Sequence, residues 1–253
     1  MIALIIVLVI YVVVKAVGVA RGPLPSAGSL ALYLVIWPGV RTDPFALRRD
    51  GDRGAARLIG QGTAVAAAGS LGWWLLAATG DRLPPGLAGW LGVAVLLTTF
   101  HCGLSDVVSG GLRRAGYPVR RLFRDPLASR SLREFWSSRW NVAFVEMNQV
   151  VFLPWLRRHL GRAAHAAVFV LSGLLHELAI SLPVRAGFGL PTAYFMLHAV
   201  ATHLERRLGV ARWPGWAGRL WTWALVVLPL PLLFHRAFRD AVVLPLFGLG
   251  GPR

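Results

Sequence analysis

The sequence predicts an all-α, polytopic integral membrane protein, with about seven to nine transmembrane or buried helices around an intramembrane chamber. Its 253 residues are 56% hydrophobic and their mean hydropathy is +0.58, whereas soluble domains are nearer about 45–50% apolar. The excess lies in blocks of roughly 20 residues, the length that crosses a ~30 Å hydrocarbon core. The blocks are continuously apolar and do not alternate, which favours helices over the strands of a barrel.

The expected helices are the apolar blocks in chain order, and a sequence pattern fixes each end only to within several residues. The first block lacks the basic segment of a secretory leader, so it is expected to be a retained span. The second, sixth and seventh blocks are shorter than a full crossing, which makes the expected helix number a range. The blocks are Ile2–Ala20, Leu30–Val40, Leu58–Thr79, Leu87–Val108, Ala163–Leu182, Pro191–Leu204 and Leu220–Phe234, with a weaker tail at Ala241–Leu249.

A further segment, Val142–Leu156, is apolar but interrupted by polar side chains. It contains Glu146, Asn148 and Gln149 and is short for a lipid-facing span. Non-standard segments at membrane depth are tolerated where protein or a cavity surrounds them. The segment is therefore expected to be a helix buried within the protein or lying at the membrane interface.

The formal net charge of +16 comes almost entirely from arginines in the loops between apolar blocks. This placement fits the positive-inside rule and contact with membrane lipids better than a nucleic-acid groove, so no nucleic-acid partner is expected. The Arg41–Arg57 and Arg113–Arg139 loops are separated by two helices and the short Asp81–Gly86 turn. Both loops are therefore expected on the cytoplasmic side of a multi-pass protein in a bacterial cytoplasmic membrane. No internal repeat divides the chain, and residues 1–253 are expected to form one domain.

The sequence offers no pattern for a metal site. Cys102 is the only cysteine, which excludes an intramolecular disulfide and a thiolate cluster. His176-Glu177 is not followed by a histidine one turn later, so the zinc-protease pattern is absent. The Gly-x-Ser-x-Gly pattern of serine hydrolases is absent as well. Neither a metal nor a cofactor is expected.

Histidines lie inside two of the apolar blocks. On a helix, His165, Ser172 and His176 fall within about 40° of one another, and His198 belongs to a polar stripe on the following block. An ionisable side chain at bilayer depth costs at least ~2.5 kcal/mol on insertion scales, so it usually faces a cavity and has a role. The two stripes are expected to face a shared interior. The alternative is that they only supply hydrogen bonds between helices.

Two motifs together carry a family resemblance. Phe135-Trp-Ser-Ser-Arg-Trp-Asn141 is followed by Ser172-Gly-Leu-Leu-His-Glu177. The pair resembles the wax-synthase-like branch of the membrane-bound O-acyltransferase family, and the likeness is strongest over residues 120–205.

Two shorter elements add to this resemblance. Trp37-Pro-Gly-Val-Arg41 is similar to an early element of that branch, and Phe195-Met-Leu-His198 to a later one. Ala199 stands where the branch is expected to have glycine.

The resemblance implies a catalytic pair and a reaction. The family's intramembrane histidine and upstream asparagine or aspartate map onto His176 and Asn141. The implied enzyme moves an acyl group from acyl-CoA, as a co-substrate, to the hydroxyl of a lipophilic alcohol: a long-chain alcohol, a sterol or a polyketide- or terpenoid-like acceptor. A buried neutral imidazole can accept the alcohol proton, and an amide donor can polarise the thioester carbonyl. Asn141 also fits a helix cap at the loop–helix junction.

The side chains around this pair are the expected substrate-binding residues: Trp136, Arg139, Trp140, Ser172, Glu177 and His198. Arg139 suits a phosphate of coenzyme A, although an ordinary juxtamembrane role fits it too, and tryptophans often form interfacial belts. Two alternatives stay open. One is a small polytopic transporter or channel whose histidines relay protons, and the other is a catalytically degenerate family member, because the chain is short for the family.

Overall fold

The computed structural model describes residues 2–250, and the regular elements in that range are all helical. Three helical stretches of the described chain are long and apolar enough to cross a membrane: Pro85–Arg114, Val142–Val184 and Gly215–Leu233. The expected all-α fold class is confirmed, and these are the helices of a membrane protein. The expected number, about seven to nine, also counts shorter and buried helices, and it stays a prediction.

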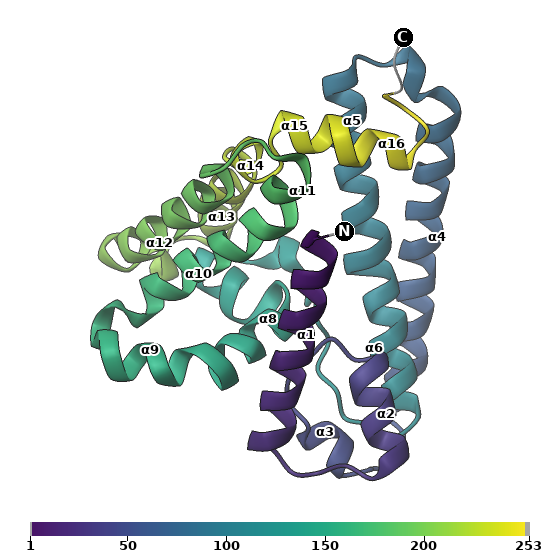
Figure 1. Ribbon diagram of the computed structural model, residues 1–253, viewed down its shortest axis with the longest axis vertical. Helices are drawn as coiled ribbons and strands as arrows, with labels where there is room; N and C mark the ends of the chain where they lie inside the picture. Colours follow the sequence, from purple (N-terminus) through teal and green to yellow (C-terminus); the bar gives the residue numbers. More distant parts are fainter. Residues whose placement is uncertain (1, 251–253) are drawn as a thin grey trace.

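Most helices follow one another through short connections, whereas a long loop, residues 115–131, joins α6 to α7 (Figure 1). The helices are α1 Ile2–Arg21, α2 Ala27–Val35, α3 Asp43–Ala46, α4 Ala55–Thr79, α5 Pro85–Leu96, α6 Ser105–Arg114, α7 Leu132–Glu134, α8 Val142–Met147, α9 Leu153–Leu160, α10 Ala164–His176, α11 Leu182–Val184, α12 Leu190–Leu208, α13 Gly215–Val227, α14 Leu230–Leu233, α15 Arg236–Phe238 and α16 Leu244–Leu246. Wider π-helical turns lie at Leu97–Leu104, Phe135–Arg139, Asn148–Phe152, Glu177–Ser181 and Arg239–Val243. Such turns are frequent at functional sites.

Two groups of helices lie side by side (Figure 1). In one, α4 runs antiparallel to the continuous helix that α5, a π turn and α6 form, and α4 packs closely on α6. In the other, α10 packs along α12, with α13 nearby. α1 stands between the groups and contacts the π turns Asn148–Phe152 and Glu177–Ser181. Both turns contain polar residues: Asn148 and Gln149 lie in the first, and Glu177 and Ser181 lie in the second.

Most expected helices are present with shifted ends. Leu58–Thr79 lies within α4, Leu87–Val108 within the longer Pro85–Arg114 helix, and Pro191–Leu204 within α12. The prediction of a helix over Leu30–Val40 is wrong for its last five residues, because α2 ends at Val35. Pro38 explains the end, because it lacks the N–H that a helix interior needs and restricts the residue before it.

The polar segment after Asn141 forms a helix, as expected for Val142–Leu156. Glu146 is 4% exposed and Asn148 is 6% exposed, which favours the buried alternative. The chain then turns at Gly161, whose φ of 50° suits glycine. α9 and α10 therefore run in different directions (Figure 1), and α10 with its π turn provides the expected span Ala163–Leu182.

The single lysine of the sequence holds the loop after α2. Lys15, in α1, is 2% exposed. Its Nζ donates to three carbonyl oxygens, at 2.9, 2.6 and 2.7 Å, those of Tyr33, Trp37 and Gly39. All three ammonium donors are therefore used. The ammonium also lies 3.8 Å from the centroid of the Tyr33 ring, a favourable cation–π contact.

The other side of the same loop packs on α8 and α1. The Glu146 carboxylate accepts a hydrogen bond from the Val40 N–H at 3.2 Å and attracts the Lys15 ammonium. A Cβ at Gly18 would overlap the Val40 carbonyl oxygen, so α1 needs glycine where the loop approaches it. The Trp37–Arg41 motif is thus fixed between a buried cation and a buried carboxylate.

The two arginine-rich loops lie at the same end of the α4–α6 pair. The Arg49 N–H donates to the Gly116 carbonyl oxygen at 2.9 Å, and Arg113 pairs with Asp52 at 3.6 Å. The Asp81–Gly86 turn is at the opposite end of these helices (Figure 1). At 1.5 Å per residue the 25 residues of α4 extend roughly 37 Å, enough to separate the two ends by a bilayer core.

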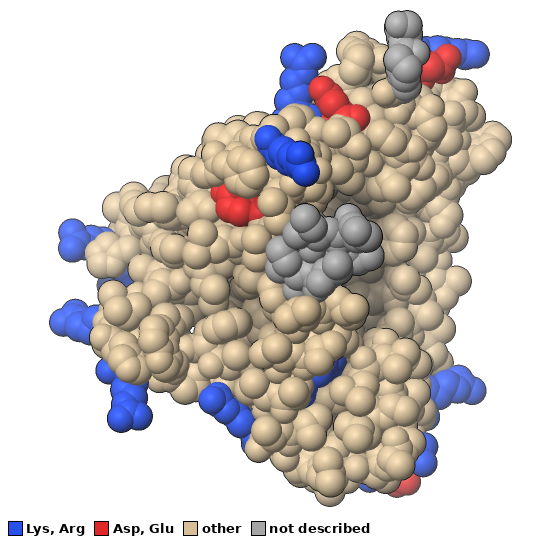
Figure 2. All heavy atoms as spheres, viewed as in Figure 1, with Lys and Arg blue, Asp and Glu red and all other residues tan. Residues whose placement is uncertain are grey.

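Large apolar side chains occupy much of the outer surface. Leu71, Trp74 and Leu75 of α4 are each about half exposed or more, and so are Val200 and Leu228 in the other group. Figure 2 shows a face on which most of the described residues are uncharged and most Lys and Arg lie near the margins. Contact with lipid tails explains an apolar surface that a soluble monomer would rarely expose.

Lys15→Met is expected to lower the free energy of unfolding by at least about 2 kcal/mol, because three buried carbonyl oxygens lose their donor. Thermal unfolding in detergent measures the effect. Val12→Met, at an exposed position of the same helix, is the control and should melt like the wild type. Equal melting of both variants would show that the ammonium is not needed.

The arginine-rich loops are expected to face the cytoplasm, opposite the Asp81–Gly86 turn. Single cysteines replacing Arg53 and Pro85 in a Cys102→Ser background should react with a membrane-impermeant thiol reagent from opposite sides. In oriented vesicles, labelling of both positions from one side would rule this topology out.

Candidate active site

His176 ends α10 and is followed directly by the π turn Glu177–Ser181. Its Nδ1 lies 2.7 Å from the carbonyl oxygen of Ser172, one turn earlier. A carbonyl oxygen only accepts hydrogen bonds, so Nδ1 carries the proton, and in the neutral ring Nε2 keeps its lone pair. The half-buried ring packs on Phe195 with 4.5 Å between ring centroids. A general base needs an unprotonated nitrogen, and this tautomer provides one at Nε2.

His198, in α12, has the opposite tautomer. Its ring is 0% exposed, and Nδ1 accepts a hydrogen bond from the Trp136 indole N–H at 3.1 Å. In the neutral ring the proton is therefore on Nε2, which has no hydrogen-bond partner within residues 2–250. His198 fixes the Trp136 ring and does not present a free acceptor nitrogen.

Aromatic rings connect the two histidines. Trp136 lies 5.7 Å from Phe195 and 5.1 Å from His198, measured between ring centroids. Phe195 in turn contacts His176. The structure thus brings together three of the expected site residues around Phe195. His165, which the helical spacing places on the same face as His176, is exposed. The interior that α10 and α12 share therefore includes His176 and does not reach His165, near the start of α10.

The segment that carries Trp136 and Asn141 is held by α12. The buried carboxylate of Glu205 accepts hydrogen bonds from the N–H groups of Leu132 and Arg133, at 2.6 and 3.2 Å. Together with the His198–Trp136 bond, this contact fixes the segment to α12 at two points, two helical turns apart. The register between the two motifs therefore depends on buried polar contacts.

Arg139 has structural partners. Its Nε donates to Glu134 at 2.6 Å, and Nη1 donates to the carbonyl oxygens of Arg124 and Asp125. Burial raises the pKa of Glu134, but hydrogen bonds from the Arg130 N–H and the Arg139 guanidinium outweigh it and hold that pKa below its usual value. Arg139 therefore folds the loop onto itself, and its binding of a phosphate stays a prediction.

Trp140 stacks between two rings. Its ring lies 5.5 Å from Phe135 and 6.1 Å from His101, with interplanar angles of 13° and 10°. Phe135 in turn meets Trp136 edge to face, with 4.8 Å between ring centroids and an interplanar angle of 90°. Both tryptophans of the motif thus face protein interior and are tied to the same aromatic cluster.

Asn141 begins α8 in a left-handed conformation, with φ 45° and ψ 63°. Its Oδ1 accepts a hydrogen bond from the Phe144 N–H at 3.2 Å, so the asparagine caps the helix. The expected position at a loop–helix junction is confirmed. The cap uses the oxygen only, so the amide nitrogen still has two donors. A joint role with His176 stays a prediction.

Glu177 joins the two packed helices. Its Oε1 accepts from the N–H groups of Gly189 and Thr192 and from the Thr192 hydroxyl, at 2.9 to 3.1 Å. A carboxylate at a helix N-terminus satisfies free N–H groups and opposes the helix dipole. The residue after His176 thereby holds the start of α12. Ser172 contributes its carbonyl to His176, and its buried side chain lies on the same turn.

Some residues of this arrangement carry little signal in the sequence. Phe195 covers His176 although it reads as ordinary apolar sequence, and its only signal was its place in the Phe195–His198 element. Glu205 lies two turns after His198 on α12, but nothing in the sequence indicates its distant partners. Of residues 2–250, no three His, Cys, Asp or Glu side chains gather as a metal site would require.

The fold and this site define a helical membrane protein with a histidine presented between packed helices. Residues 119–197 match the model described as the membrane bound O-acyl transferase family. The match confirms the predicted resemblance over that segment. No solved structure was found to match the chain.

The curated relatives are plant proteins. The chain is 36% identical over 111 residues to a probable long-chain-alcohol O-fatty-acyltransferase 2 of Arabidopsis thaliana, covering 39% of this chain and 32% of that protein. It is 31% identical over 129 residues to the long-chain-alcohol O-fatty-acyltransferase of Simmondsia chinensis, covering 45% of this chain and 37% of that protein. The chain thus spans about a third of the length of the relatives it matches.

Asn141→Gly separates capping from chemistry. Glycine adopts the left-handed conformation freely and costs only a few tenths of a kcal/mol as an N-cap, while the amide is lost. We expect turnover to fall about 10²–10³-fold if the amide polarises the reacting carbonyl, with a nearly unchanged melting temperature. A fully active, equally stable variant would leave Asn141 as a cap alone.

Proposed function

We propose that the protein is a membrane O-acyltransferase that moves an acyl group from acyl-CoA to the hydroxyl of a lipophilic alcohol. The observation that carries this proposal is the hydrogen bond from His176 Nδ1 to the Ser172 carbonyl, which leaves Nε2 as an acceptor inside an apolar helix. The family match and the alcohol-acyltransferase names of the relatives support the same reaction class.

In the proposed reaction, His176 Nε2 takes the proton of the acceptor hydroxyl as its oxygen attacks the thioester carbonyl carbon. The carbonyl oxygen gains negative charge in the tetrahedral intermediate, and the Asn141 amide donates a hydrogen bond to it. The intermediate then collapses, the carbon–sulfur bond breaks, and the imidazolium returns the proton to the leaving thiolate. The products are an ester and free coenzyme A, and no net proton is gained or lost.

The surrounding side chains are assigned supporting roles. Trp136 and Trp140 form an aromatic wall suited to acyl and acceptor chains, and His198 positions Trp136 through its indole N–H. Ser172 and Glu177 position His176 and the start of α12. Arg139, at the edge of the arginine-rich loop, is assigned to the coenzyme A phosphates.

The acceptor and location follow the same reasoning. The relatives' names specify long-chain alcohols, and we extend the acceptor class to sterols and polyketide- or terpenoid-like alcohols. Both substrates meet at His176 within the membrane, with coenzyme A approaching from the arginine-rich side, which we assign to the cytoplasm of a bacterial cell.

His176→Ala should abolish acyl transfer, because a general base ordinarily contributes roughly 10²–10⁴-fold. Purified protein is incubated with labelled acyl-CoA and a panel of lipophilic alcohols, and ester formation is counted. His165→Ala, at an exposed histidine of the same helix, is the matched control and should retain activity. If the His176 variant keeps activity within about threefold of the wild type, the histidine is not the base.

A further inference from the structure

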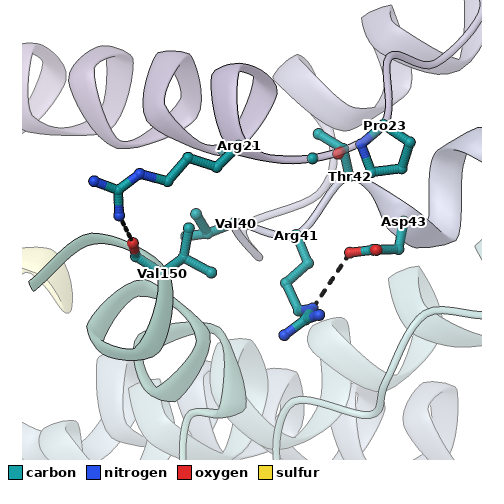
Figure 3. A pocket seen from close by; sticks show the side chains of 9 residues that line it. Arg21, Pro23, Val40, Arg41, Thr42, Asp43 and Val150 are labelled. Atoms are coloured by element: carbon teal, nitrogen blue, oxygen red, sulfur yellow. Dashed lines mark hydrogen bonds and ion pairs between the residues drawn. The ribbon is translucent and has the colours of Figure 1, made fainter. Parts of the chain in front are cut away.

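A cavity of about 180 Å³ lies beside the end of α1 (Figure 3), and His176 is not among the residues that line it. Its walls come from the last turn of α1, the loop between α2 and α3, and the π turn at Val150. The loop is the end of the Trp37–Arg41 motif, which the chemistry proposed above does not use. The side chains that give the cavity its character are Arg21, Arg41, Thr42 and Asp43.

Two guanidinium groups line this cavity with donors to spare. Arg21 uses Nη1 on the Val150 carbonyl oxygen, and Arg41 uses Nε on the Asp43 carboxylate at 3.3 Å (Figure 3). Each guanidinium has five N–H groups, so most remain available. The Arg41–Asp43 pair is about half exposed, at 47% and 54%, and such pairs are weak. With one carboxylate against two cations, the lining carries one excess positive charge.

Thr42 adds a buried hydroxyl that the fold does not satisfy. The residue is 0% exposed, and its Oγ1 has no hydrogen-bond partner in the described chain. Most buried polar atoms are paired, so an unpaired one needs an explanation. A ligand oxygen in the cavity that Thr42 lines would supply the missing partner.

The cavity is built on rigid supports. Lys15 and Glu146 fix the preceding residues of the loop from opposite sides. Gly22 lets the loop approach α1 closely, because a Cβ there would overlap Thr42 Oγ1. The arginines therefore project from a backbone that is already held in place, which lowers the entropic cost of binding a ligand.

We propose that this cavity binds a phosphate group, held by Arg21 and Arg41 with a hydrogen bond from the Thr42 hydroxyl. Guanidinium groups favour phosphate because they donate paired, charge-assisted hydrogen bonds. The phosphate can belong to a nucleotide, in which case the site would serve the acyl donor and rests on the proposed function. It can equally belong to a phospholipid headgroup, in which case the site tethers the protein to its own membrane.

The test measures binding, not turnover. The full chain is purified in a phosphate-free detergent, and its melting temperature is followed against coenzyme A, against adenosine 3′,5′-bisphosphate and against a short-chain phosphatidylglycerol. The wild type should be stabilised by at least one probe, and the Arg21→Gln/Arg41→Gln double variant should bind that probe at least about tenfold more weakly. Arg158→Gln, at an exposed arginine of α9, is the control and should bind like the wild type.

Thr42→Val separates binding from folding. Valine has the shape of threonine and removes an unpaired buried hydroxyl, so the variant should be at least as stable as the wild type without ligand. It should still bind the phosphate probe more weakly, by several-fold. Stabilisation by the two nucleotide probes alone assigns the site to the acyl donor, and stabilisation by the lipid alone assigns it to a headgroup.

The proposal is overturned if no probe binds, or if the double variant and Thr42→Val bind as tightly as the wild type. Because no turnover is measured, a protein that binds the probes but transfers no acyl group would refute the proposed function and leave the phosphate site standing.

Discussion

The burial of one ammonium group constrains the N-terminal half of the molecule. A charge removed from water is costly unless its donors are satisfied, and Lys15 satisfies all three on carbonyl oxygens of the loop after α2. Those carbonyls are available because Pro38 ends the helix and leaves the backbone free. Glu146 completes the arrangement from α8. The same contacts set the position of Arg41 and Thr42. The shape of the cavity beside α1 therefore depends on Pro38, which ends the helix, and on the Lys15 ammonium.

The second half of the molecule is organised around α12. Glu177 caps its start, His198 holds Trp136 from its middle, and Glu205 holds the start of α7 near its end. Two buried side chains of α12, His198 and Glu205, together with the Glu177 carboxylate at its start, thus connect both motifs of the candidate site to one helix. Apolar packing alone would not fix the alignment of the two motifs along α12, because the same apolar side chains can face either lipid or protein. The two histidines also differ in tautomer for a simple reason: one faces a carbonyl acceptor and the other an indole donor.

Sequence patterns predict the features that depend on neighbouring residues, which are the helices and the buried positions within them. Apolar length predicted most helices, and the isolated histidines in apolar sequence predicted that His176 and His198 lie close to a common cluster. The prediction failed at residues 36–40, where the apolar run continues but Pro38 ends the helix. It also could not anticipate that Glu205 would meet Leu132, since contacts over such separations follow from the assembled fold. The tautomers of the two histidines could not be predicted from the sequence either, because each is set by the hydrogen-bond partner of one ring nitrogen.

The burial of Lys15 also makes the protein chemically unusual. Within the 253 residues it is the only lysine, and the folded protein shields its side-chain amine almost completely. An amine-reactive reagent would therefore find no accessible ε-amine on the native molecule, whereas separation of α1 from the loop would expose a single one. Modification of this single ε-amine, located by peptide mapping, would thus report opening of the junction without any engineered probe.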